Sequence, residues 1–431
     1  MAFKIGLLGY GTVGTGTAEI ILDPEGRNSL LSEIEISRVG VRSLDKQRSP
    51  QLPAGVLTTD LESIVTDPEI KVVVELLGGL EPSRSLILKA IEHGKHIVTA
   101  NKAVIARHGE EIFTAANQAG VYVLLEAAVG GGIPVIKPLK QSLGVNRIQT
   151  VIGIINGTTN YILTQMTQEG ADFEEVLTEA QKLGYAEADP TADVDGYDAA
   201  DKIAILAAIA FNGRIKRDEI SCEGIRQITA TDISYADDLG FVIKLLAIAK
   251  ANPDDKDDSL QVRVHPTLVS KDHPLANVNG VYNAVLVEGS PLGQVMLYGP
   301  GAGKGATASA VVSDVVNIVG FLQTNQTQKL DPMLRCPHEH FKQLTPVSEI
   351  QSRFYARFLC EDVSGVIGHL GTSFGKHDVS LESVVQIGFR DNLAEIVVVT
   401  HDVREGNFRT ALEEIKSLDS INSIPSILRV L

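Results

Sequence analysis

Six carboxylates and one lysine lie within residues 187–202, EADPTADVDGYDAADK. This composition suits a cation-binding loop, a solvated acidic connector, or an active site built around the closing Lys202. A calcium loop needs an acidic ligand at its first position and a glutamate at its twelfth. With Gly196 at the sixth position, those places hold Thr191 and Lys202. The sequence therefore argues against a calcium loop.

Lys202 shares a helical face with Asp198, four residues earlier, and the segment IAILAAIAF that follows is apolar on nearly all sides. This pattern is typical of a buried helix. A lysine there must be paired or partly desolvated, and proton-transfer groups are tuned in such surroundings. A structural ion pair is the alternative. Asp201 lies about a hundred degrees round the helix from Lys202, so we expect it to be solvated or to cap the helix.

The first residues predict a dinucleotide-binding turn. The apolar run FKIGLL leads into GYGTVG at residues 9–14 and then into a helical pattern. Gly9, Gly11 and Gly14 would serve the tight turn, the approach of backbone to a pyrophosphate, and close packing of helix on strand. Arg42 follows the second strand, where NAD-selective folds carry an acidic residue. NADP is therefore favoured over NAD, although a surface arginine is the alternative.

Beyond this turn, β-branched runs alternate with helical segments up to residue 130, which predicts a parallel, doubly wound sheet. Ligands bind at the carboxyl ends of such strands, so TANK at residues 99–102 places Lys102 near the cofactor. Four helices are expected next, YILTQMTQ, DFEEVLTEAQKLG, DAADKIAILAAIAF and DDLGFVIKLLAIAKA, followed by strand-like runs. The end of the chain reads β-α-β-β-α-β, a ferredoxin-like module without a catalytic constellation.

The predicted fold class is α/β, with a Rossmann-type parallel sheet, an α+β substrate domain and the ferredoxin-like module. We expect a dinucleotide-binding domain at 1–130, a substrate and dimerisation domain at 131–321, a linker at 322–350 and the module at 351–431. A later segment near 300–321, a glycine loop that feeds a helix, is expected to pack back onto the first domain.

Composition limits the partners. The net charge of −16 disfavours nucleic acid and acidic membrane surfaces. No apolar run approaches the length of a membrane span, and the three cysteines lack CxxC spacing, so we expect a cytoplasmic protein. Histidine is not well placed as a proton shuttle, because His93, His96 and His108 flank helices and CPHEH falls in the linker.

In its motifs the chain resembles the homoserine dehydrogenase family, of the monofunctional bacterial kind that ends in an ACT domain. The likeness covers essentially the whole chain; its parts are GYGTVG, TANK, EAAVGGGIP at 126–134, NGTTNYIL at 156–163 and the stretch at 183–202. It implies reversible reduction of L-aspartate 4-semialdehyde to L-homoserine with NAD(P)H, in threonine, methionine and isoleucine biosynthesis. A homodimer or homotetramer is expected.

The resemblance also implies roles for residues. Lys202 matches the proton donor and Lys102 the other lysine at the reaction centre, although which lysine gives the proton stays open. Glu187, Asp198 and Lys102 would bind the substrate. Asp198 would also be catalytic, together with the two lysines. The cofactor contacts would be Gly9, Gly11, Thr12, Val13, Gly14, Arg42, Lys102, Gly184 and Gly303.

EAAVGGGIP resembles the family's loop for a monovalent cation, in which Glu126, Val129, Gly131 and Ile133 would offer backbone carbonyls to sodium. Taken alone, the segment is only a glycine-rich turn. The terminal module resembles an ACT domain, and EDVSGVIG at 361–368 matches its ligand loop. Threonine feedback inhibition is therefore a hypothesis.

Two alternative functions remain. An aldehyde-oxidising, phosphorylating dehydrogenase shares the Rossmann start but needs an activated cysteine, and Cys222 has no neighbouring histidine or asparagine. A non-catalytic amino-acid sensor is the second alternative, and the intact glycines and both lysines argue against it.

Overall fold

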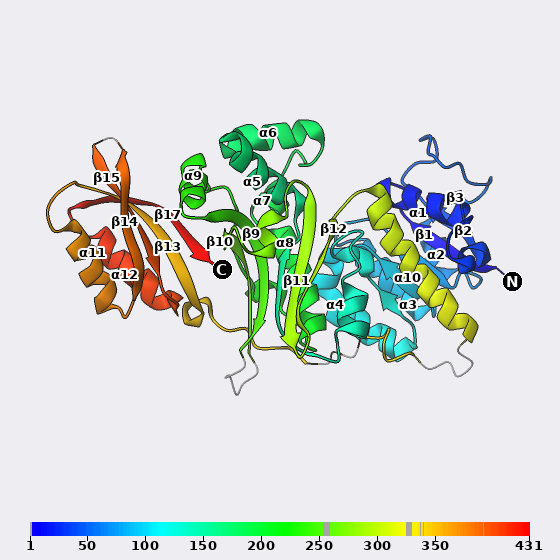
Figure 1. Cartoon of the computed structure of the whole chain (residues 1–431). Coiled ribbons are helices and arrows are strands. Elements are labelled where there is room, and N and C mark those ends of the chain that lie inside the picture. Colours follow the sequence, from blue (N-terminus) through cyan, green and yellow to red (C-terminus); the bar gives the residue numbers. More distant parts are fainter. Residues whose placement is uncertain (1, 253–258, 325–329, 337, 339, 391) are drawn as a thin grey trace. The chain divides into compact units, whose positions relative to one another are not determined.

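The computed structural model describes residues 2–252, 259–324, 330–336, 338, 340–390 and 392–431. The chain divides into two compact units. The first comprises Met1–Ile155, Asp201–Glu219 and Tyr282–Lys342, and the second Asn156–Ala200, Ile220–Val281 and Gln343–Leu431. Figure 1 labels the elements along the chain.

The first unit contains a parallel sheet of short strands. Their bounds are Phe3–Leu8 (β1), Ile34–Gly40 (β2), Leu57–Thr58 (β3), Val72–Glu75 (β4), His96–Thr99 (β5) and Val123–Leu124 (β6). The strand order is β3-β2-β1-β4-β5-β6, and every neighbouring pair is parallel. The predicted doubly wound sheet is confirmed. In this order the chain reverses direction across the sheet between β1 and β4, and ligands bind at such a switch point.

Helices cover this sheet. They are Thr12–Leu22 (α1), Leu61–Thr66 (α2), Ser83–Glu92 (α3), Lys102–Ala119 (α4) and, much later in the chain, Lys304–Thr324 (α10). Helix α10 lies along α1, so closely that a Cβ on Gly16 would lie 3.0 Å from the Cβ of Ala308 (Figure 1). Val311 and Val315 of α10 share one core with Ile5. Among the described residues α10 alone is long and apolar enough to cross a membrane, and its place in this core accounts for that composition.

Three antiparallel strands complete the described sheets of the first unit: Arg147–Ile154 (β7), Tyr282–Ser290 (β11) and Gly293–Pro300 (β12), in the order β12-β11-β7. The expected strand before NGTTNY is thus β7. Helix Tyr197–Ala210 (α8) contains the boundary between the units, because Ala200 belongs to the second and Asp201 to the first.

The second unit begins with helices Gly157–Glu169 (α5), Phe173–Leu183 (α6) and Thr191–Val194 (α7). After the short strand Ser221–Cys222 (β8) and helix Ala230–Asp238 (α9), strands Phe241–Ala251 (β9) and Leu260–Ser270 (β10) pair antiparallel along their whole length. Strand β8 pairs with β10 in parallel. The predicted helices YILTQMTQ and DFEEVLTEAQKLG are confirmed by α5 and α6.

The helix predicted over residues 237–251 is wrong. Helix α9 ends at Asp238, Gly240 has a left-handed φ of +83°, and the chain continues as β9. Residues 243–249 are all buried. A strand covered on both faces loses the alternation of apolar and polar residues, so FVIKLLAIA has the same appearance as a buried helix.

The terminal module follows the predicted β-α-β-β-α-β order, interrupted by the two-residue strand Val403–Arg404 (β16). Its elements are Gln351–Cys360 (β13), Val366–Lys376 (α11), Leu381–Arg390 (β14), Leu393–Thr400 (β15), Glu405–Lys416 (α12) and Ile421–Val430 (β17). Phe354 stacks on Phe408 at 4.2 Å in its core. Strand β17 pairs with β13 and also, in parallel, with β10. The module is therefore joined to the sheet of the second unit by backbone hydrogen bonds.

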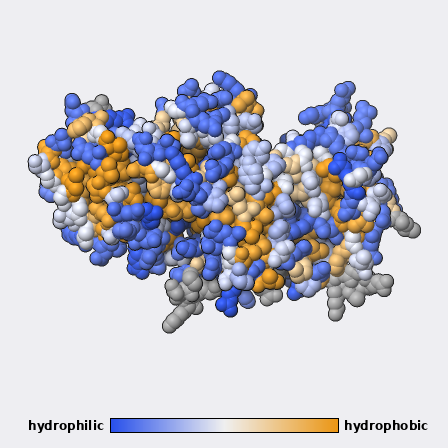
Figure 2. Space-filling model, viewed as in Figure 1, coloured by the Kyte–Doolittle hydropathy of each residue, from blue (hydrophilic) through white to orange (hydrophobic). Residues whose placement is uncertain are grey.

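Apolar side chains also reach the surface of the module. Strand β14 is an edge strand, and it exposes Val385 and Phe389. Figure 2 shows apolar residues gathered over this part of the molecule. An exposed, apolar edge strand is a template for pairing with another chain.

Candidate active site

The three glycines of the first turn differ in what surrounds them. Gly9 has a φ of +110°, and a Cβ on it would lie 2.8 Å from the carbonyl oxygen of Leu76. A Cβ on Gly14 would lie 2.3 Å from the carbonyl oxygen of Gly9. Around Gly11, at the N-terminus of α1, a Cβ would meet no described atom within 4 Å. The turn thus leaves open backbone at a helix N-terminus, where an anion such as a pyrophosphate fits.

A buried carboxylate organises the strand ends beside this turn. Glu75, the last residue of β4, accepts hydrogen bonds from Leu77 N at 2.9 Å and from the hydroxyl of Thr99 at 2.7 Å. The Asn101 amide donates to the carbonyl oxygen of Gly79 at 2.8 Å, and its oxygen caps α4. Sequence reasoning missed Glu75, although a carboxylate inside the apolar run KVVVELL was a signal.

This network fixes Lys102, the first residue of α4, at the carboxyl end of β5. Its side chain is half-buried. The same edge of the sheet carries the Gly9 turn, since the carboxyl ends of parallel strands lie together. Lys102 therefore lies at the carboxyl-end edge of the sheet, which is the edge where ligands bind in folds of this class.

Lys202 is buried on α8, with 9% of its surface exposed. Its Nζ donates to the carbonyl oxygen of Ile155, immediately after β7, at 2.6 Å. The burial expected from the apolar helix is confirmed. A desolvated ammonium held by a carbonyl has a defined position, and an ammonium can donate three hydrogen bonds in all.

Asp198, one turn before Lys202 on α8, is held by an amide. Asn156 Nδ2 donates to Asp198 Oδ2 at 2.9 Å and to Asp193 Oδ1 at 2.7 Å. The Oδ1 of Asn156 accepts from Thr159 N at 2.8 Å, which caps α5. Because both amide hydrogens are used, Asn156 orients the Asp198 carboxylate. Sequence reasoning missed this role, although NGTTN has the pattern of a helix N-cap.

The expectation that Asp201 is solvated or caps the helix is wrong. Asp201 is buried, and its carboxylate accepts from Arg217 Nε at 2.6 Å and from Arg107 Nη1 at 3.0 Å. Helix α8 is covered on this side as well, so a charge there requires a partner. The sequence could not supply those partners, which lie 16 and 94 positions away.

Glu187 lies in the loop after α6. Gly184 ends that helix with a φ of +78°, and Gln181 Nε2 donates to the carbonyl oxygen of Glu187 at 3.0 Å. The hydroxyl of Thr158 holds the same loop through the carbonyl oxygen of Tyr185 at 2.8 Å. Glu187 is exposed and belongs with Asp198 to the second unit, whereas both lysines belong to the first.

The predicted cation loop is folded around a carboxylate. Glu126 is buried, and its side chain accepts from the backbone N–H groups of residues 135, 136 and 137 at 2.7, 2.8 and 2.9 Å. Gly131 has a φ of +54°, and a Cβ on it would lie 2.4 Å from the carbonyl oxygen of Gly301. Since the Glu126 carboxylate is occupied by backbone donors, a cation here would be held by carbonyl oxygens, as the resemblance implies.

Asp314, on α10, supports this loop. It accepts from Glu126 N at 2.8 Å and forms an ion pair with Lys137 at 3.1 Å. Burial raises the pKa of its carboxyl to about 6. Helix α10 thus holds both α1 and the 126–137 loop.

The remaining predicted residues lie at loop positions. Arg42 is exposed, two residues after β2, and Gly303 precedes α10 with a φ of +111°. Neither His96 nor His108 flanks a helix as expected. His96 lies in β5, and its Nδ1 accepts from Tyr122 N at 3.0 Å, whereas His108 lies inside α4. CPHEH lies partly outside the described residues, at positions 337 and 339. Within the described part of the chain, no group of three or more His, Cys, Asp or Glu side chains could hold a metal.

The first unit also has a cavity of about 590 Å³ along α4 and α8. Phe113 and Ile205 line it, with Arg107 and Arg217, but neither Lys102 nor Lys202 does. The cavity therefore lies apart from the predicted reacting groups.

Comparison with known families gives a family model for each part of the chain. Residues 134–316 match the family model described as homoserine dehydrogenase, and residues 9–126 match that of the homoserine dehydrogenase NAD-binding domain. Residues 354–420 match the ACT domain.

Individual proteins are similar along the full chain. A homoserine dehydrogenase of Synechocystis sp. is 69% identical, with all of both chains covered. The crystal structure of a homoserine dehydrogenase from Thiobacillus denitrificans has a TM-score of 0.91 and 41% identity, covering 100% of this chain and 98% of that one. A hyperthermophilic archaeal homoserine dehydrogenase in complex with NADPH has a TM-score of 0.62 and 26% identity, covering 75% and 99%.

Proposed function

Because the chain belongs to the homoserine dehydrogenase family, we propose that Lys202, Lys102, Asp198 and Glu187 form its catalytic and substrate-binding site. The reaction is the reversible NAD(P)H-dependent reduction of L-aspartate 4-semialdehyde to L-homoserine, in amino-acid biosynthesis. Neither the phosphorylating dehydrogenase nor the non-catalytic sensor is favoured. One observation carries the site proposal: a buried lysine lies one helical turn from a carboxylate that is oriented by an amide.

The roles follow from charge. Reduction of the aldehyde places a negative charge on its oxygen, and an ammonium aimed at that oxygen stabilises the charge and can transfer a proton to it. Lys202 is assigned this proton, and Lys102 adds a second positive charge. Asp198 and Glu187 are acceptors for the ammonium and hydroxyl groups of the amino acid. The bound nicotinamide cofactor supplies the hydride.

The cofactor is proposed to lie on the turn of Gly9, Gly11, Thr12, Val13 and Gly14, with Gly184 and Gly303 as further contacts. The open backbone around Gly11 supports this placement. Arg42 lies where a 2′-phosphate would be recognised, so NADP is the preferred form. Arg42→Ala is expected to raise KM for NADPH with little change in KM for NADH.

Sodium is proposed to bind the carbonyl oxygens of Glu126, Val129, Gly131 and Ile133. The left-handed turn at Gly131 and the occupied Glu126 carboxylate support a site built from carbonyls. Titration calorimetry with sodium chloride against N-methylglucamine chloride tests it, and equal heats for both salts would contradict it.

The wider assembly is also proposed. The domains are expected at 1–130, 131–321 and 351–431, joined by the linker at 322–350, in a cytoplasmic homodimer or homotetramer. The apolar edge of β14 supports self-association. Threonine is the proposed effector of the ACT domain, at residues 361–368, where Gly365 has a φ of +98°.

One assay tests these assignments together. Initial rates of semialdehyde reduction are measured with NADPH and NADH, with and without threonine. NADPH is expected to give the higher kcat/KM, and threonine to lower the rate. Gly365→Ala, strained at its positive φ, should weaken threonine inhibition, whereas Gly371→Ala, where a Cβ meets no described atom within 4 Å, should keep it. Equal inhibition of both variants would remove the 361–368 loop as the effector site.

A further inference from the structure

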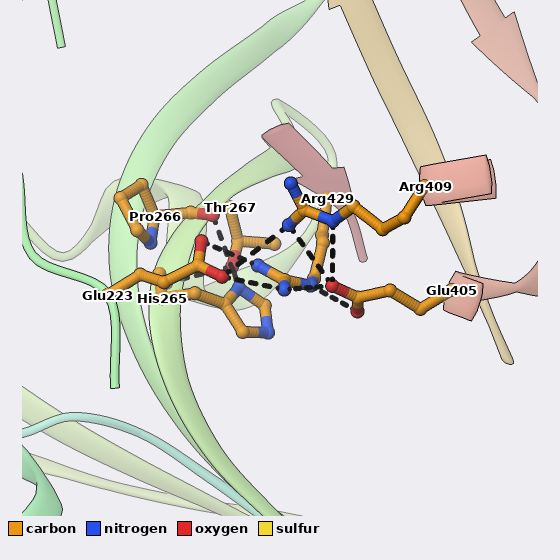
Figure 3. A network of polar contacts seen from close by, with 7 residues as sticks. All are labelled: Glu223, His265, Pro266, Thr267, Glu405, Arg409 and Arg429. Atoms are coloured by element: carbon orange, nitrogen blue, oxygen red, sulfur yellow. Dashed lines mark hydrogen bonds and ion pairs between the residues drawn. The ribbon is translucent and has the colours of Figure 1, made fainter. Parts of the chain in front are cut away.

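The last strand of the chain carries an arginine that binds two carboxylates. Arg429, on β17, is 4% exposed. It donates to Glu223 through Nη1 at 2.9 Å and Nη2 at 2.8 Å, and to Glu405 through Nε at 3.0 Å and Nη2 at 2.6 Å. Figure 3 shows the guanidinium between the two carboxylates, with Arg409 beside them. Bidentate pairing of this kind fixes both distance and orientation.

Glu223 belongs to a segment, residues 222–226, that is hydrogen-bonded to the turn between α7 and α8. Ile225 N donates to the carbonyl oxygen of Val194 at 2.8 Å. Cys222 Sγ donates to the carbonyl oxygen of Asp195 at 3.2 Å, and Arg226 Nε donates to its carboxylate at 2.6 Å.

The two segments approach so closely at this point that a side chain could not be accommodated. A Cβ on Gly224 would lie 2.2 Å from the carbonyl oxygen of Val194 and 2.5 Å from the Cα of Asp195. A displacement of the 222–226 segment must therefore move Val194 and Asp195, because packed backbones transmit it directly.

The turn between α7 and α8 lies next to Asp198, the carboxylate proposed to bind the substrate. Asp193 and Asp198 flank Val194 and Asp195, and both receive hydrogen bonds from the single amide of Asn156. A shift of Asp193 would thus displace the Asn156 amide, which also orients Asp198. The contacts form a continuous path, from Arg429 through Glu223 and Asp195 to Asp198.

We propose that Glu223 is a positioning residue, which couples the ACT domain to the substrate carboxylate Asp198 through the 222–226 segment. The coupling rests on the proposed function in one respect, namely that Asp198 binds the substrate. Through these contacts a movement of the terminal strand β17 would reach Asp198. A ligand that displaces β17 would therefore change substrate affinity.

A cluster of ion pairs elsewhere in the domain provides a control. Arg357 of β13 binds Glu395 of β15, inside the domain, at 2.7 Å and Asp232 of α9 at 2.8 Å, and all three are buried. The hydroxyl of Tyr235 on α9 also donates to Glu395 at 2.5 Å, so this cluster joins the ACT domain to α9. The Asp232 carboxylate accepts from Arg357 and from Thr229, the N-cap of its own helix, and neither partner belongs to residues 193–198. Glu395→Gln therefore weakens the attachment of the domain at a place off the path.

The experiment compares Glu223→Gln with Glu395→Gln in the full-length enzyme. The glutamine at 223 keeps the volume but loses the charge-assisted pair with Arg429. We expect KM for aspartate semialdehyde to rise roughly fivefold, with KM for NADPH unchanged, a size typical of coupling between sites. Glu395→Gln is expected to leave both constants within about twofold.

Hydrogen exchange gives a readout that does not depend on substrate. In ligand-free Glu223→Gln, backbone amides of residues 191–200 and 222–228 should exchange faster than in the parent enzyme, and in Glu395→Gln they should not. Equal exchange in all three proteins overturns the coupling. If exchange accelerates in Glu223→Gln but Asp198→Asn leaves KM for the semialdehyde unchanged, the mechanical link stands and the substrate role of Asp198 is wrong. A rise in KM for both glutamine variants would indicate general loosening and also overturn the proposal.

Discussion

Buried charges in this protein are held by specific neutral or charged groups. Lys202 has the Ile155 carbonyl, Asp198 has the Asn156 amide, and Asp201 has two arginines. The printed hydrogen bonds of Lys202 and Asp198 to a carbonyl and an amide fix where the two charged groups lie. The ion pairs of Asp201 satisfy its charge within the protein. The same helix thus carries one structural carboxylate and one that is suited to binding.

Sequence reasoning separated these residues only in part. The helical face shared by Asp198 and Lys202 was visible, because spacing along one helix is local. The partners of Asp201 and the amide that holds Asp198 come from positions distant in the chain. Residue types and spacing therefore identified the buried lysine, while tertiary contacts decided which carboxylate is structural.

A partly buried histidine gives a pH-dependent stability. Burial lowers the pKa of His96 to about 4, and its Nδ1 accepts from Tyr122 N. In the unfolded chain the imidazole binds a proton near pH 6.5, whereas in the folded chain it does so only near pH 4. The free energy of unfolding therefore falls as the pH drops from about 6.5 towards 4. At about pH 5 the loss should reach about 2 kcal/mol relative to neutral pH. Urea unfolding at the two pH values measures it.

His96→Asn is the control for this prediction, because the amide oxygen can accept from Tyr122 N without titrating. Its unfolding free energy should change less between neutral pH and about pH 5, by about 2 kcal/mol. An identical pH dependence in both proteins would show that His96 does not carry the effect.

At the scale of elements, the glycine turn and the parallel sheet followed from the sequence, whereas β9 did not. The geometry of GYGTVG is determined locally, since Gly14 is constrained by Gly9 within the turn and Gly9 by Leu76, which follows the neighbouring strand β4. Strand β9 is buried along residues 243–249, so its periodicity disappears and only its pairing with β10 defines it. Pairing partners are tertiary information, which local patterns lack.

We expect alanine substitutions in the glycine turn to have two different effects, a loss of stability at Gly14 and a loss of cofactor affinity at Gly11. A methyl group on Gly14 would lie 2.3 Å from the carbonyl oxygen of Gly9, so Gly14→Ala must push α1 away and should cost about 1–3 kcal/mol of stability. Gly11→Ala meets no described atom within 4 Å and should fold with nearly normal stability, yet bind NADPH more weakly because the methyl occupies space at the proposed pyrophosphate. Thermal unfolding and cofactor titration separate the two. Normal NADPH affinity in Gly11→Ala would place the pyrophosphate elsewhere.

For the whole molecule, the ACT domain is more than an appended module. Its last strand, β17, pairs with β10, and Arg429 binds Glu223. The β-α-β-β-α-β order predicted the module, but the strand shared with the rest of the second unit was not visible in the sequence. The β17 strand and the Arg429–Glu223 pair therefore both attach the domain to the rest of the second unit.

A chain ended near residue 350 is predicted to lose more than regulation. It leaves Thr267 and Leu268 of β10 without their β17 partners and Glu223 without Arg429, and unpaired edge backbone promotes association between chains. Sedimentation velocity should show aggregates that the full-length enzyme does not form, together with a lower thermal midpoint. A truncated enzyme of unchanged size distribution and midpoint would show that β17 contributes little to β10.

The central claim is that the buried amine of Lys202 delivers the proton during reduction. Lys202→Met keeps the apolar stem and removes the ammonium, and the single-turnover rate of NADPH oxidation with saturating aspartate semialdehyde reports the chemical step. The rate is predicted to fall at least about a hundredfold, with the dissociation constant of NADPH unchanged. An unchanged single-turnover rate would contradict the assignment.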